Sequence, residues 1–203
     1  MIFKRFIMVN TIVLLLFLLV SSDLISQEKV QKNDFRNSKW GMKKDKVLST
    51  EKNKPLEAGP YNPYFAAVYT GEVAGLKAYY KYSFLDDVLV RGDYVLKEKH
   101  YNKNKYITDY NKLKEILTRK YGGPIKDVEN WYNDQYKDRT QDYGLAVSIG
   151  HLAFQSDWET DRTLVWLTLK GGNFDIGINI FYVSKLHKEL TDKAEEKSQE
   201  QGL

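Results

Sequence analysis

The sequence predicts an α+β protein built on a twisted antiparallel sheet, with helices on one face of that sheet. Residues 76–84 alternate between two sets of side chains, one almost wholly apolar, which is typical of a half-buried strand. Residues 106–121 instead repeat apolar side chains at helical spacing, and Gly122-Gly123-Pro124 then ends the helix. Strand and helix patterns follow one another in blocks, which favours an α+β arrangement.

The composition is that of a folded globular chain without thiol chemistry. The 203 residues are 42% hydrophobic and 29% charged, which excludes wholesale disorder and collagen-like repeats. The absence of cysteine excludes disulfides, thiolate catalysis, thiolate zinc sites and lipid attachment through cysteine. The three histidines lie far apart, and the chain contains no serine-nucleophile motif and no glycine-rich phosphate loop. We therefore expect neither an enzyme nor a bound cofactor.

The first 26 residues predict a signal peptide. Lys4 and Arg5 precede an almost wholly apolar run over residues 6–20, and small residues follow it. This run is shorter than the roughly 20 apolar residues that a membrane-spanning helix needs. Cleavage after either Ser22 or Ser26 leaves a small residue at the cut. We expect export to the periplasm or the exterior, with no transmembrane anchor after cleavage; an uncleaved anchor is the alternative.

The rest of the chain predicts a single α+β domain over residues 34–186, followed by a helix end and a charged tail over residues 187–203. A loop is expected over the proline-rich residues 52–63. The order of helix, three strands, helix, three strands and helix indicates two helix-plus-three-strand halves. The expected strands are residues 65–69, 76–84, 88–96, 125–132, 152–158, 163–169 and 174–183, and the expected helices are residues 43–51, 106–121, 143–149 and 184 to about 194.

The segment Phe35-Arg36-x-x-x-Trp40-Gly41-Met42 resembles a motif near the mature start of many uncharacterised exported bacterial proteins, in which Trp-Gly-Met leads into a helix. The resemblance covers about residues 34–184. It departs at Lys43, where a capping Ser or Thr commonly follows the Met. The helix-then-sheet order is also similar to small periplasmic modules of the β-lactamase-inhibitor-like or outer-membrane-assembly lipoprotein type. The resemblance implies an exported bacterial protein and no catalytic residues.

Fifteen tyrosines exceed what a core of this size needs. Tyrosine gives binding surfaces contact area at low entropic cost, so we expect a binding face on the open sheet, with Tyr79, Tyr94 and Tyr132 as contacts. Its partner would be another envelope protein or a glycan. The alternative is that the tyrosines fill the core and strand surfaces, because tyrosine favours strands. The basic segment 97–120 is compatible with a polyanion or acidic surface, and its alternative is a solvated helix face. Lysines outnumber arginines 25 to 6, and we expect no nucleic acid.

Two further motifs support alternative functions. Asp157, Glu159 and Asp161 offer alternating carboxylates, either for a cation or for a carboxylate-dependent extracytoplasmic hydrolase. Calcium takes about six to eight oxygens, and turns favour aspartate anyway, so a structural use competes with this interpretation. Arg91-Gly92-Asp93 spells the tripeptide of integrin ligands and makes surface adhesion the other alternative, with a bulge or bend at Gly92 as its structural interpretation. We expect an exported non-enzymatic binding or cell-envelope module.

Overall fold

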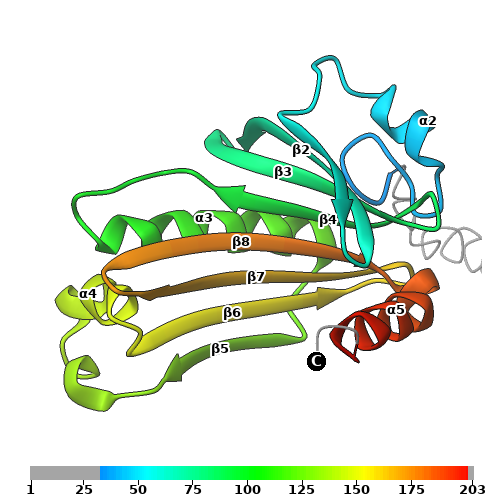
Figure 1. Ribbon diagram of the computed structural model, residues 1–203. Helices are drawn as coiled ribbons and strands as arrows, with labels where there is room; N and C mark the ends of the chain where they lie inside the picture. The colour runs from blue at the N-terminus through cyan, green and yellow to red at the C-terminus, as the bar shows by residue number, and fades with distance from the viewer. Residues whose placement is uncertain (1–32, 201–203) are drawn as a thin grey trace, which may run out of the picture. The chain divides into compact units, whose positions relative to one another are not determined.

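Antiparallel strands make up most of the protein, whose computed structural model describes residues 33–200 (Figure 1). All eight strands belong to one sheet, in the order β1-β2-β3-β4-β8-β7-β6-β5. The strands are β1 (Glu57–Tyr61), β2 (Tyr64–Val73), β3 (Leu76–Leu85), β4 (Val88–Leu96), β5 (Lys126–Trp131), β6 (Leu152–Glu159), β7 (Thr163–Gly172) and β8 (Asp175–Ser184). The α+β class and the antiparallel sheet are therefore confirmed. The signal-peptide prediction over residues 1–26 lies outside the described residues.

The sheet consists of two four-strand meanders that meet at one seam. Strands β1 to β4 pair in chain order, and so do β5 to β8. At the seam, β4 pairs with β8 in an antiparallel register that runs from Arg91 opposite Val183 to Val95 opposite Asn179. Residues about 90 positions apart in the sequence thus become direct neighbours in the sheet.

Alternation along the strands gives the sheet an inner and an outer face. In β3, Tyr80, Tyr82 and Phe84 are buried on the inner face, as the period-two pattern predicts. A register shift opposite Ser83 and Phe84 makes Val90 an extra residue in β4. This bulge lies two positions before Gly92, close to the bend expected there.

The expectation of a loop over residues 52–63 is wrong in part, because residues 57–61 form β1. This strand lies at the edge of the sheet and pairs with β2, with Gly59 opposite Ala66. Its proline, Pro60, lacks a backbone N–H, which an edge strand tolerates because one side of it has no neighbouring strand. The prolines and glycine of residues 52–63 therefore belong partly to an edge strand and partly to turns.

The described residues contain four α-helices: α2 (Lys44–Leu48), α3 (Asn104–Tyr121), α4 (Tyr143–Ser148) and α5 (Lys188–Glu200). Helix α3 buries the predicted stripe that includes Tyr110, Leu113 and Leu117, and it ends at Gly122 with a φ of 87°. Helices α3 and α4 both contact β6, β7 and β8. None of the helices within residues 33–200 has the length and apolarity that a membrane crossing requires.

The C-terminal helix differs from expectation in length and placement. Helical structure extends to Glu200 rather than fraying after Ala194, and Lys188 pairs with Asp192 one turn later. Glu195 lies 3.8 Å from Arg91, whose side chain lies on the outer face because its neighbour Gly92 faces inward. The expectation that all helices lie on one face is therefore not confirmed.

Candidate functional site

Residues 34–40 cross the inner face of the sheet and are called the strap here. Phe35 lies at its centre, with its ring 5.3 Å from each of the rings of Tyr82, Tyr94 and Tyr182. Gly92 lies directly beneath this ring, because only a residue without a Cβ leaves room for it. The aromatic cluster thus fastens the strap across the seam between β4 and β8.

A buried carboxylate anchors the start of the strap. Asp34 accepts two hydrogen bonds from Arg162, at 3.0 Å from Nε and 2.9 Å from Nη2, and a third from the backbone N–H of Trp40 at 2.9 Å. The Trp40 indole N–H in turn donates to Thr163 Oγ1 at 2.8 Å. These bonds join the strap to Arg162 in the loop between β6 and β7 and to the first residue of β7, so Trp40 of the Trp-Gly-Met motif serves packing.

Arg36 joins the strap to a second buried carboxylate. Its Nε donates to Glu51 at 3.1 Å, its guanidinium lies 3.7 Å from the centre of the Tyr80 ring, and Nη1 donates to the Tyr94 hydroxyl at 3.4 Å. Glu51 also accepts hydrogen bonds from the hydroxyls of Tyr80 and Tyr82. Burial opposes ionisation of Glu51, but the bonds from Tyr82, Tyr80 and Arg36 outweigh it and hold its pKa below the usual range.

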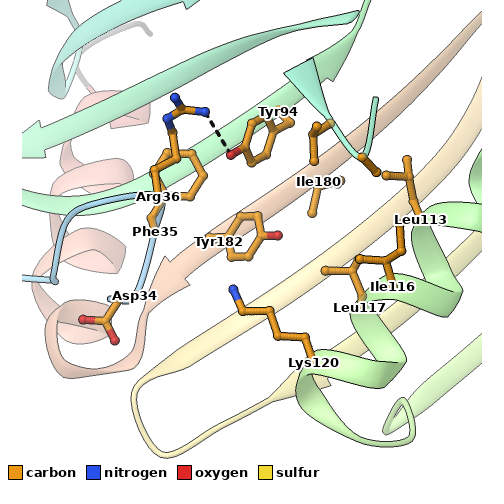
Figure 2. Close-up of a pocket in the computed structure, with 12 residues that line it drawn as sticks. Asp34, Phe35, Arg36, Tyr94, Leu113, Ile116, Leu117, Lys120, Ile180 and Tyr182 are labelled. Carbon is orange, nitrogen blue, oxygen red and sulfur yellow. Dashed lines mark hydrogen bonds between the residues drawn. The ribbon is translucent and has the colours of Figure 1, made fainter. Parts of the chain in front are cut away.

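The strap, α3 and the seam of the sheet enclose a pocket of about 290 Å³ (Figure 2). Most of its wall is apolar or aromatic, which is the usual character of a small-molecule site. Val73 and Ala74, at the end of β2, close one side of it. The residues that line the pocket are Asp34, Phe35, Arg36, Val73, Ala74, Tyr94, Leu113, Ile116, Leu117, Lys120, Ile180 and Tyr182.

Lys120 brings a positive charge to this apolar pocket. Figure 2 shows its side chain rising from α3 with the ammonium group directed toward the Tyr182 ring, across the pocket from Asp34. Partial burial lowers the pKa of Lys120, and Asp34 opposes that shift. The Asp34 carboxylate is already bonded to Arg162, so the ammonium receives little compensation from it.

Tyr182 provides a neutral polar group opposite Lys120. Its side chain is buried, and burial, together with the neighbouring Tyr121 and Tyr94, raises the pKa of its phenol well above the usual value. The phenol therefore keeps its proton throughout the physiological pH range. The phenol hydroxyl is hydrogen-bonded to Tyr121, and as a neutral group it cannot balance the charge of Lys120.

The three tyrosines predicted as ligand contacts do not come together. Tyr94 is buried on the inner face and lines the pocket. Tyr79 is 38% exposed on the outer face, where the Lys97 ammonium lies 4.3 Å from its ring centre. Tyr132 is 73% exposed just beyond β5. Sequence reasoning missed Lys120 and Tyr182, because only the packing of α3 on β8 places them together.

The three carboxylates proposed for a cation or for hydrolysis have other partners or lie apart. Asp157 accepts two hydrogen bonds from the Gln155 amide, at 2.8 and 3.0 Å, and Glu159 pairs with Lys185. Asp161 lies in the turn between β6 and β7. Within residues 33–200, no three or more His, Cys, Asp and Glu side chains form a group that could hold a metal ion. These carboxylates therefore form no metal cluster.

The Arg91-Gly92-Asp93 tripeptide lies inside β4, the fourth strand of the sheet. Asp93 is only 2% exposed, and its carboxylate pairs with Arg91 at 2.9 Å and with Lys81 at 3.1 Å. Gly92 lies under the Phe35 ring. The aspartate of the tripeptide is therefore buried and paired within a strand rather than placed on an exposed loop.

Comparison of the chain with protein-family models, with curated proteins and with solved structures found no match.

Proposed function

We propose that the protein is an exported, non-enzymatic binding module that takes a small molecule into the pocket between the strap, α3 and the seam. The observation that carries the proposal is the pocket itself, an apolar space of about 290 Å³ into which one ammonium group points. Ligand sites commonly combine apolar walls with a few polar groups that orient the ligand. The predicted signal peptide supports the export part of the proposal.

The two-half organisation expected from the sequence fits this function. In the proposed arrangement, each half is a helix with its meander, and the pocket lies where the two meanders join. Its floor uses Tyr94 from β4 and Ile180 and Tyr182 from β8.

The test is a screen of small apolar and amphipathic molecules for binding to the mature chain, by ligand-observed NMR. Ile116→Phe fills part of the pocket from α3, and Val128→Phe places the same side chain on β5, away from the pocket. We expect hits whose binding is lost in Ile116→Phe and kept in Val128→Phe, with circular dichroism confirming that both variants fold. The proposal fails if no molecule binds or if every hit binds both variants equally.

A further inference from the structure

We infer that the ligand of this pocket is a small amphiphile with a single negative charge, whose anionic group pairs with Lys120 and whose apolar body lies against Leu113, Leu117 and Ile180. The inference rests on the proposed function and adds the chemical class of the ligand to it.

A count of the charges around the pocket leaves one positive charge. The Asp34 carboxylate is neutralised by Arg162 through two hydrogen bonds of 2.9 and 3.0 Å. The Arg36 guanidinium is neutralised by Glu51 at 3.1 Å. Lys120 is then the remaining charge: within residues 33–200 its ammonium has no ion-pair partner within 4.0 Å, and it lies 4.7 Å from the centre of the Tyr121 ring. One anionic group on the ligand would neutralise this remaining positive charge.

The surroundings of Lys120 make such a pair favourable. Partial desolvation of the Lys120 ammonium beside the apolar wall lowers its pKa, although the residue as a whole is exposed. A carboxylate or phosphate oxygen beside it restores the lost interaction through a charge-assisted hydrogen bond. A neutral ligand of the same shape would add no charge-assisted hydrogen bond to the ammonium, and a cationic ligand would repel it.

The volume limits the size of the ligand. A pocket of about 290 Å³ holds roughly ten water-sized groups, because one water molecule occupies about 30 Å³ of the liquid. This room suits a short alkyl or aryl chain with one anionic end group. It is too small for both chains of a diacyl lipid, so the occupant proposed is a free small molecule.

The test compares octanoate with octanamide, two molecules of the same length and of about ten non-hydrogen atoms each that differ in charge. Isothermal titration of the mature chain at neutral pH measures both affinities. Because hydrogen bonds to charged groups are worth more than neutral ones, we expect octanoate to bind about tenfold more tightly than octanamide. Lys120→Met removes the charge and keeps the length of the side chain, Lys120→Arg keeps the charge, and Lys112→Met is the matched control at an exposed position of α3.

The expected result is that Lys120→Met abolishes the preference for octanoate and leaves octanamide binding unchanged. Lys120→Arg and Lys112→Met should keep most of the preference. Equal binding of octanoate and octanamide to the wild type, or a preference that survives Lys120→Met, would overturn the inference while leaving the proposed function intact. Absence of binding by both molecules also overturns it, and the broader screen with Ile116→Phe then decides the proposed function separately.

Discussion

The Phe35 ring packs so closely on Gly92 that a Cβ added to Gly92 would lie 2.3 Å from Phe35 Cδ1. Real Cβ contacts are never this short, and the ring is held on its other sides by Tyr82, Tyr94 and Tyr182. The Phe35 ring therefore cannot move aside without disturbing the cluster that fastens the strap. This one contact links the strap to the centre of the sheet.

Gly92→Ala should destabilise the protein by about 2 kcal/mol, the usual cost of an overpacked core. Urea unfolding followed by fluorescence measures the change in the free energy of unfolding. Gly59→Ala in β1 is the control, because nothing lies within 4 Å of its added Cβ, and its change should stay within about 0.5 kcal/mol. Equal stabilities of the two variants would contradict the close packing of Phe35 on Gly92.

Glu51→Gln should lower the free energy of unfolding by about 2 kcal/mol, since hydrogen bonds to a charged group are lost and the Arg36 guanidinium is left without its counter-ion. The Glu51 side chain is 7% exposed, so water replaces these bonds poorly. Urea unfolding checks the prediction. Glu57→Gln, at an exposed position in β1, is the matched control and should change little. A small effect of Glu51→Gln would mean that the pair between Arg36 and Glu51 does not hold the strap.

Acid should remove the stability that the ionised Glu51 carboxylate contributes to the folded state. The folded-state pKa of Glu51 lies below its ordinary value of 4.5, so the folded state favours the ionised form. The stability from this shift is fully present above the unfolded-state pKa and is lost as the pH falls through the folded-state pKa. The stability difference between wild type and Glu51→Gln should therefore be largest near neutral pH and shrink in acid. A difference that stays constant from pH 7 to pH 3 would contradict this assignment.

Ser156→Ala should cost about 2 kcal/mol, because it leaves the buried Tyr110 hydroxyl without its hydrogen-bond partner. Ser156 Oγ lies 2.6 Å from the Tyr110 hydroxyl and donates to Asp127 Oδ1 at 2.6 Å. A double-mutant cycle with Tyr110→Phe measures the coupling. The double variant should lose less stability than the sum of the two single variants, because both members of one bond are then absent. Additive losses would show that the two side chains do not interact.

The periodic elements were predicted well because their patterns are local. The strand over residues 76–84 and the helix over residues 106–121 both appear, since alternation and helical spacing follow directly from which side chains are buried. Strand β1 was missed because Pro60 weakens a strand signal, and nothing local shows that the strand lies at an edge. The end of α5 was missed because its polar residues resemble a tail.

The candidate site was predicted only in part. Tyr94 was among the expected contacts and lines the pocket, whereas Tyr79 lies on the opposite face and Tyr132 lies beyond β5. Strand alternation separates Tyr79 from inward-facing Tyr80, the residue paired with Tyr94. Whether Tyr79 or Tyr80 lies on the side of the pocket depends on which face of the sheet α3 covers. The pattern of a single sequence does not show which face a helix covers.

What the sequence by itself determined is the α+β class, most element positions and the chemistry that a cysteine-free chain lacks. These properties depend on residue type and on spacing over one or two turns of chain. The tertiary structure decided that Asp34 meets Arg162, that Arg36 meets Glu51, and that Lys120 brings a positive charge to the lining of an apolar pocket. Such pairs join segments up to 128 residues apart, and only the docking of β4 on β8 and of α3 on the sheet brings them together.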